Sequence, residues 1–306
     1  MAGREQAIQT RELVARRLQG GGVDWRGAAL EGLLLLTLLV SLGVLFVLLA
    51  DTLLTALPVL VERPLEFLTS PLSARTERAG IIQAIVGSVT ITILVVMLAI
   101  PVGVGAAIYL EEYARDTRLA RFIRTNIRNL AGVPAIVYGL LGLAVFSTTL
   151  GLGSTLLAGG LTLSILVLPI VVITTSEALT AVPDAIREAA FGVGATRWET
   201  IRSHVLPYAA PGILTGTILS LARAFGETAP LLVVGAIAGT FSFVGAPWEQ
   251  LFEGYTTLPT IVYHWAGYPQ DEFRALSAAT IVVLLGVILL ANATAILLRN
   301  RYDRKW

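Results

Sequence analysis

The sequence predicts an all-α, polytopic membrane protein with six transmembrane helices. Of its 306 residues, 55% are hydrophobic and only 14% are charged, and the mean hydropathy of +0.77 lies outside the range of soluble globular domains. Six apolar runs are each long enough to cross a hydrocarbon core, which needs roughly 20 residues. The six spans are expected at residues 28–57, 81–110, 126–150, 155–182, 207–238 and 275–298.

The first span stands apart from the other five. Residues 28–57 form an apolar run about twice the length of the hydrophobic region of a signal peptide, so a transmembrane helix is the better interpretation. The polar tail before it contains five arginines. Residues 58–80, with three prolines and mixed charges, are expected to form an exposed connection. We therefore expect residues 1–80 to form one region and residues 81–306 to form the core.

The next three spans are rich in glycine. Residues 81–110 are interrupted by Pro101 and contain glycines that allow close approach between helices. A charged segment with several arginines leads to the third span at 126–150. The tight turn at 151–154 then connects directly to the fourth span at 155–182.

A polar stretch of some twenty residues, the elbow, separates the fourth and fifth spans. Pro183 is expected to begin a short helix, and the glycines near 192–195 to make a turn. Thr196 and Glu199 fit a capping box that opens a second short helix, which is expected to end before Pro207 opens the fifth span. The pattern predicts a helix-turn-helix at the membrane surface, and an amphipathic loop in the headgroup region is the alternative.

Arg223 is the most informative residue of the fifth span. It follows Pro207 by 16 positions, so it is expected roughly 24 Å along a helix at 1.5 Å per residue. An arginine at that depth costs at least about 2.5 kcal/mol unless it faces protein or water. Glu227 lies one helical turn later. The two residues form either a buried ion pair that fixes packing or a pore site whose planar guanidinium binds an oxyanion.

Aromatic residues collect in the connection between the last two spans. Trp248, Tyr255, Tyr263 and Trp265 suit an interfacial aromatic belt, although simple surface packing explains them equally well. Pro247 also lies in this connection. The sixth span then ends in a basic tail.

The basic residues predict the orientation. Seventeen lie on the side of the two termini: in the N-terminal tail, at 115–128, in the elbow and in the C-terminal tail. Four lie on the opposite side, and Arg223 lies within a span. By the positive-inside rule, the termini and the elbow are expected to be cytoplasmic.

Several kinds of chemistry have little support in this sequence. It contains no GxxxxGK[ST] phosphate-binding loop, and the glycines at 103–105 lie within a membrane span, so ATP hydrolysis by this chain is not expected. There is no cysteine, and His204 and His264 are too far apart in the sequence for a metal cluster. No Ser-His-Asp set and no pair of carboxylates converges in an identifiable pocket. We expect no catalytic residue, no metal, no cofactor and no nucleic-acid partner; the surroundings are the lipid bilayer.

Six residues of the elbow at 183–207 form a spaced motif. They are Glu188, Ala189, Ala190, Gly194, Leu206 and Pro207. Their spacing resembles the EAA loop of ATP-binding-cassette (ABC) importer permeases, in which this loop docks on a cytoplasmic ATPase. The resemblance implies a type I, MetI-like permease core. His204 departs from the pattern, which usually has an apolar residue at that position.

A second resemblance covers about residues 81–306. The segments ARAFGETAPLL around Arg223, NLAGVPAIVYGL at 129–140, PVGVGAAIYLEEYA at 101–114 and TLPTIVYHWAG at 257–267 are similar to the PstA-type permeases of phosphate ABC importers. The resemblance implies a role in phosphate passage for Arg223 and Glu227. It also implies a sister permease, an ATPase dimer that binds the ATP, and an external phosphate-binding protein.

Other functions remain open at this point. A permease for another oxyanion, such as sulfate or molybdate, fits the same residues. An ATPase-independent secondary carrier explains the spans and Arg223 but leaves the elbow unexplained. A signalling scaffold that reports phosphate status to a sensor is compatible with transport.

Overall fold

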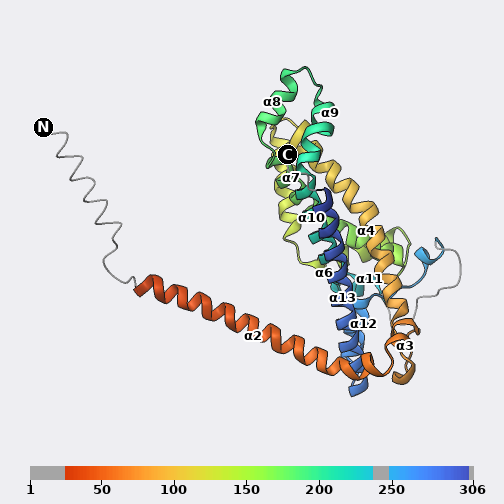
Figure 1. Cartoon of the computed structure of the whole chain (residues 1–306). Helices are drawn as coiled ribbons and strands as arrows, with labels where there is room; N and C mark the ends of the chain where they lie inside the picture. Colours follow the sequence, from red (N-terminus) through yellow and green to blue (C-terminus); the bar gives the residue numbers. More distant parts are fainter. Residues whose placement is uncertain (1–24, 237–247, 303–306) are drawn as a thin grey trace. The chain divides into compact units, whose positions relative to one another are not determined.

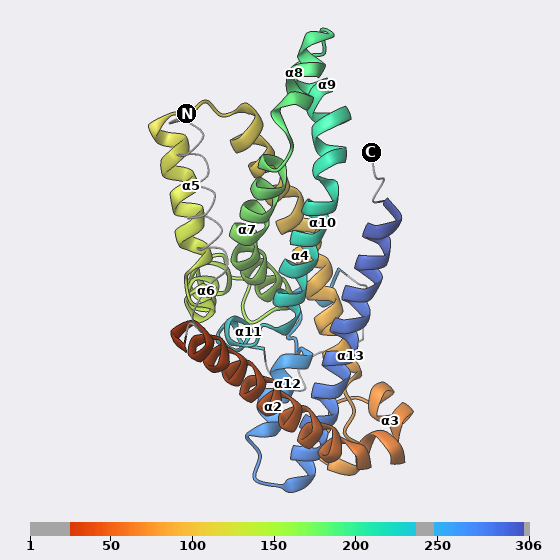
Figure 2. The same ribbon diagram turned by 60° about the vertical axis from the view of Figure 1, so that its left-hand side comes forward.

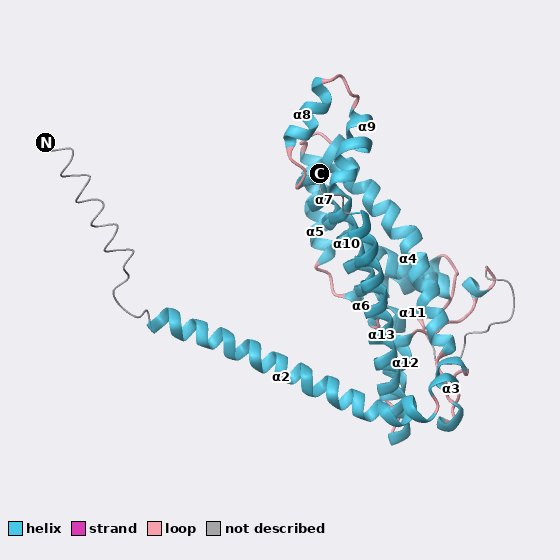
Figure 3. Ribbon diagram, viewed as in Figure 1, coloured by secondary structure: helices cyan, strands magenta, loops and turns pink. Residues whose placement is uncertain are grey.

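The computed structural model describes residues 25–236 and 248–302, and this part of the chain is helical with no strand (Figure 3). The polar tail before residue 25, the expected end of the fifth span, Pro247 and the last four residues lie outside the described residues. The elements are α2 (Trp25–Glu62), α3 (Pro64–Thr69), η1 (Thr76–Arg78), α4 (Ile82–Ile108), η2 (Tyr109–Tyr113), α5 (Arg118–Ala131), α6 (Ala135–Gly142), η3 (Leu143–Thr149), α7 (Leu156–Thr180), α8 (Asp184–Gly192), α9 (Arg197–Thr200), η4 (Ile201–Val205), α10 (Leu206–Gly226), α11 (Ala229–Val234), η5 (Gln250–Phe252), α12 (Leu258–Ala266) and α13 (Asp271–Tyr302).

The expected membrane spans are recovered as five long apolar helices and one bent helix pair. The chain divides into two compact units, Met1–Asp51 and Thr52–Trp306, and the division falls within α2. Of the first unit, the structure describes only the first part of α2. The boundary expected near residue 80 stays a prediction.

Helix α7 forms the centre of the second unit. It contacts α4, α5, α6, α10 and α11, and Figure 2 shows it between α5 and α10. Two of its buried hydroxyls are satisfied within the helix, since Thr162 donates to the carbonyl of Ala158 and Ser164 donates to that of Gly160, whereas Thr175 Oγ1 is buried without a hydrogen-bond partner among the described residues. Such bonding lets polar residues occupy an apolar interior without an unpaired group. Helix α7 therefore provides the fixed surface on which the other helices pack.

The third span differs from the sequence prediction. It begins at Arg118 rather than near 126, and the two helical parts, Arg118–Ala131 and Ala135–Thr149, meet at a bend of 102°. Pro134 is the N-cap of α6 with φ −56° and ψ 137°, so it stands just outside the helix, where its missing N–H breaks no helical hydrogen bond. By contrast, α4 continues through Pro101 without the expected interruption.

The fifth span was predicted with both ends misplaced. Residues Arg197–Gly226 form one continuous helical stretch, so Pro207 does not begin a new helix. A π-helical turn, η4, directly precedes Pro207 and accommodates its missing N–H. The stretch ends at Gly226 rather than near 238, because Glu227 is extended and α11 begins separately.

Two connections are more buried than the sequence predicts. Pro58 lies inside α2, and Phe67 of α3 is fully buried with residues of α12 and α13, so residues 58–80 are not a simple exposed connection. Tyr255 and Trp265 are also buried, whereas Trp248 and Tyr263 are exposed. The aromatic belt is therefore wrong for the two buried residues, which fill the interior around α12.

Candidate functional site

The first helix of the elbow, its turn and the start of its second helix fold as the sequence predicts, whereas the second helix does not end before Pro207. Helices α8 and α9 project from one end of the second unit, which we call the elbow end (Figure 1). Gly194 has φ +87°, a left-handed conformation that glycine adopts without a Cβ penalty. The capping box is present: Thr196 Oγ1 accepts from the Glu199 N–H at 3.3 Å, and Glu199 Oε2 accepts from the Thr196 N–H at 2.8 Å. Pro183 is the N-cap of α8 rather than its first residue.

The tip of the elbow presents apolar side chains. Glu188 and Ala189 are exposed, while Ala190 is 5% exposed and anchors α8 inward. The exposed large apolar residues nearby are Phe191, Val193 and Trp198, with exposed fractions of 48%, 85% and 55%. Exposed apolar residues gathered at a protruding tip mark a surface suited to a protein partner.

Arg187 fastens the elbow to the rest of the unit, a role that the sequence analysis missed. Its Nη2 donates to Glu112 Oε1 at 2.8 Å and to the carbonyl of Leu179 at 2.9 Å. Its Nη1 donates to the carbonyl of Val182 at 2.8 Å. The side chains of Arg187 and Glu112 are only 19% and 8% exposed. One guanidinium thus joins α8, the end of α7 and the π-helical turn η2. The sequence signal was one basic and one acidic residue 75 positions apart, which no local rule connects.

The base of the elbow enters the span without a break. Val205 is buried, Leu206 is partly buried, and Pro207 is exposed. His204 is exposed beside Val205, so the polar residue that departs from the EAA pattern points out of the chain's own interior. Its presence therefore leaves the packing inside the second unit intact.

Arg223 and Glu227 form the expected pair, in an unexpected place. Arg223 Nε lies 3.3 Å from Glu227 Oε1, and their side chains are 55% and 18% exposed. Arg223 lies in the last turn of α10, and Glu227 is the residue that ends the helix. The guanidinium thus stands at a helix break with half of its surface uncovered by this chain, rather than in a sealed interior. It can therefore reach a ligand or a neighbouring subunit.

The candidate residues form two groups. The elbow residues and the Arg223–Glu227 pair lie on the same helical stretch, and Leu206 and Arg223 are roughly 26 Å apart along its axis at 1.5 Å per residue. At this separation they do not touch, and the helical stretch is the covalent connection between them. In the described ranges, no group of three His, Cys, Asp or Glu residues could hold a metal ion.

Several proteins of known name are similar to this chain. The Phosphate transport system permease protein PstA of Mycobacterium leprae is 35% identical over 226 residues, which cover 72% of each chain. The protein of the same name from Xylella fastidiosa strain Temecula1 is 34% identical over 228 residues, 74% of this chain and 77% of that one. The Probable ABC transporter permease protein YqgI of Bacillus subtilis is 37% identical over 172 residues, 56% of this chain and 58% of that one.

Solved structures confirm the type I, MetI-like permease fold. A chain of the bacterial alginate ABC transporter in complex with alginate pentasaccharide-bound periplasmic protein superposes with a TM-score of 0.69 at 16% identity, over 92% of this chain and 96% of that one. A chain of the MetNI methionine ABC transporter in an inward-facing conformation gives a TM-score of 0.56 at 18% identity, over 74% and 95%. Residues 99–304 match the family described as binding-protein-dependent transport system inner membrane component. The chain therefore belongs to this family of ABC transporter permeases.

Proposed function

We propose that the chain is one membrane-spanning permease subunit of an ATP-driven phosphate importer. In this function it forms half of the translocation pathway. The observation that carries the proposal is Arg223, a half-exposed arginine in an otherwise apolar span, in a chain whose relatives are named phosphate transport permeases. An arginine is costly in lipid, so its exposed half faces water or a partner subunit. Its planar guanidinium suits the bidentate binding of a phosphate group.

The proposed partners are a sister permease, an ATPase dimer and an extracytoplasmic phosphate-binding protein. The family description itself refers to dependence on a binding protein. ATP binding belongs to a partner because this sequence contains no phosphate-binding loop. The apolar tip with Phe191, Val193 and Trp198 offers the ATPase a docking surface.

The proposed orientation places both termini and the elbow in the cytoplasm of a bacterial cell, with the spans in the inner membrane. The support is the excess of basic residues, 17 against 4, on that side of the spans. In this orientation, the docking surface is on the side where ATP is available.

The continuous helix supplies the proposed mechanical link. ATP-driven closure of the ATPase dimer displaces the elbow, and the unbroken stretch Arg197–Gly226 transmits this displacement to Arg223. Arg223 then leaves Glu227 and provides a counter-charge for the passing phosphate. Afterwards the guanidinium pairs with Glu227 again, and this competition prevents the phosphate from being trapped. The pair thus alternates between an internal ion pair and an anion contact.

The test is the substitution Arg223→Gln in the purified transporter reconstituted in liposomes. We expect uptake of radiolabelled phosphate to fall at least about 100-fold, the order of loss when about 2.7 kcal/mol of stabilisation is removed. Subunit assembly, measured by size-exclusion chromatography, should stay intact. Loss of assembly would instead show that the Arg223–Glu227 pair fixes packing.

The wild-type transporter separates the alternative functions. Phosphate should stimulate its ATPase activity in the presence of the binding protein, and sulfate and molybdate should leave the basal rate unchanged. Stimulation by sulfate or molybdate instead would assign another oxyanion. Phosphate uptake without ATP would identify a secondary carrier.

A further inference from the structure

A cavity of about 570 Å³ lies between α5 and α7, at the elbow end of the second unit. Its volume is in the range of pockets that bind small molecules, roughly 300–1,000 Å³. Its lining includes the charged residues Glu111, Arg124, Arg128 and Glu177, together with Ser176. This cavity is separate from the Arg223–Glu227 pair, and the transport mechanism described above does not use it.

Helix α5, which forms one wall of the cavity, carries both exposed apolar residues and arginines. Its apolar residues Leu119 and Phe122 are 66% and 64% exposed, whereas Arg124 is partly buried and Arg128 lines the cavity. Arg118, Arg121 and Arg128 of this helix are exposed, and charged side chains at this density suit water rather than hydrocarbon. The cavity is therefore expected to hold water and ions rather than lipid tails.

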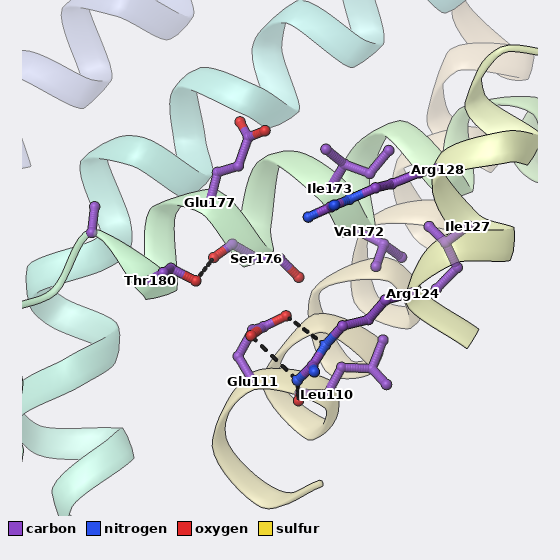
Figure 4. Close-up of a pocket in the computed structure, with 11 residues that line it drawn as sticks. Leu110, Glu111, Arg124, Ile127, Arg128, Val172, Ile173, Ser176, Glu177 and Thr180 are labelled. Carbon is purple, nitrogen blue, oxygen red and sulfur yellow. Dashed lines mark hydrogen bonds and ion pairs between the residues drawn. The ribbon is translucent and has the colours of Figure 1, made fainter. Parts of the chain in front are cut away.

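The two arginines of the cavity have different partners. Arg124 Nη2 donates to the carbonyl of Leu110, and its Nε lies 3.4 Å from Glu111 Oε1, so the charge of Glu111 is neutralised. This Nε is nevertheless buried without a hydrogen-bond partner among the described residues. Arg128 forms no ion pair or hydrogen bond with the described residues, and its guanidinium points over the cavity (Figure 4). The cavity thus offers the guanidinium of Arg128, while the lining as a whole also contains the carboxylate of Glu177.

Polar groups of α7 complete the arrangement. Ser176 lies between Arg128 and the Arg124–Glu111 pair, and the Glu177 carboxylate points away from them (Figure 4). A hydroxyl between two guanidinium groups adds a hydrogen-bond donor for an oxyanion. Glu111 is already paired, so Arg128 and Glu177 are the charged lining residues without a partner among the described residues, and of these two only Arg128 points over the cavity (Figure 4). The chemistry that fits is a tetrahedral oxyanion bound through arginine.

We propose that this cavity is a second anion site, which binds a phosphate group through Arg128 with Arg124 and Ser176 as further donors. Two sources supply that chemistry: inorganic phosphate on its way out of the pathway, and the headgroup of an anionic phospholipid. The first source rests on the proposed transport of phosphate, whereas the second does not. In both cases Arg128 is the residue whose charge holds the anion.

Chemical modification of arginine tests the site directly. The purified transporter in phosphatidylcholine nanodiscs is treated with phenylglyoxal, with inorganic phosphate or with chloride at equal ionic strength, and each arginine is quantified by mass spectrometry. Phosphate should reduce modification of Arg128 several-fold. Arg121, on the same helix and 65% exposed beside Asp116, is the matched control and should react equally in both salts.

A second arm separates the two sources. Nanodiscs that contain phosphatidylglycerol, without added phosphate, should leave Arg128 reactive if the ligand is inorganic phosphate, and should protect it if the ligand is a lipid headgroup. Equal modification of Arg128 in every condition would overturn the proposal. Protection of Arg128 by phosphate in a transporter that carries another substrate would overturn the proposed function and leave this site standing. Because Arg124 is proposed as a further donor, phosphate should also reduce its modification in the unchanged protein, and Arg128→Gln should lose this protection of Arg124 while Arg121 is unaffected.

Discussion

The two ends of the helical stretch Arg197–Gly226 are built in different ways. The elbow end is defined by local signals, a capping box at Thr196 and a left-handed glycine at 194, and it is fastened by the nearly buried Arg187–Glu112 pair. The other end stops at Gly226, where the Glu227 N–H donates to the carbonyl of Ala224, and its Arg223 is half-exposed in a single long ion pair. The Arg187 guanidinium is thus held by several contacts and that of Arg223 by one, although Ala224 beside Arg223 is packed in the core and only 3% exposed.

This difference matches the two tasks that we propose. A surface that receives force must not yield locally, since local unfolding would absorb the displacement. A residue that exchanges partners must be held weakly, since a buried, fully satisfied guanidinium would not leave its carboxylate. The contrast predicts that substitutions at the elbow alter coupling and local stability, whereas substitution of Arg223 alters passage of the substrate.

The largest effect at the elbow is expected from Glu188→Arg, which reverses a charge on the proposed docking surface. Glu188 is exposed, so the fold should be retained. We expect uptake of phosphate to fall at least about 10-fold, while the isolated ATPase keeps its basal activity, because opposite charges across an interface guide and hold the partner. Asp116→Arg is the matched control, because Asp116 is 75% exposed at the same end but off the elbow. Normal coupling of ATP hydrolysis to uptake in Glu188→Arg would exclude this surface as the docking site.

The Arg187–Glu112 pair should give the next largest effect. Arg187→Met leaves the 8%-exposed Glu112 without its partner, and breaking a buried pair in this way costs about 3 kcal/mol. Hydrogen exchange of the α8 amides should accelerate accordingly, while exchange in the core of α7 is unchanged. Arg121→Met, which breaks an exposed pair with Asp116, should change exchange little.

The double substitution Arg187→Met with Glu112→Met sharpens this result. Removing both charges should restore part of the protection, because no unpaired carboxylate remains. Unchanged exchange of α8 in the single variant would show that the pair does not fasten the elbow.

Local and long-range features differed in how well the sequence predicted them. The capping box and the turn at Gly194 were predicted correctly, since both depend on residues within four positions of each other. The Arg223–Glu227 pair was predicted for the same reason, because its partners are four residues apart. Their roles in coupling and passage stay predictions.

Features that depend on distant contacts were not predicted. The Arg187–Glu112 pair joins residues 75 positions apart, and the burial of Tyr255 depends on the helices that surround it. Prolines were the least reliable local signal. Pro101 and Pro207 lie within continuous helices, whereas Pro134 follows a bend of 102°. Whether a helix continues through a proline depends on its neighbours and on adjustments such as the π-helical turn before Pro207.

The smallest effect is expected from Thr196→Ala, which tests whether the cap stabilises α9 alone or the whole elbow. Thr196 Oγ1 accepts from the Glu199 N–H and donates to Glu199 Oε2 at 2.7 Å, and loss of such a cap costs about 1 kcal/mol. Exchange of the α9 amides should rise about 5-fold, while α8 keeps its protection through Arg187. Thr196→Ser, which keeps the hydroxyl, is the control and should behave like the unchanged protein. If Thr196→Ala loosened α8 as much as Arg187→Met does, the elbow would unfold as one unit, and the cap and the ion pair would be parts of a single fastening.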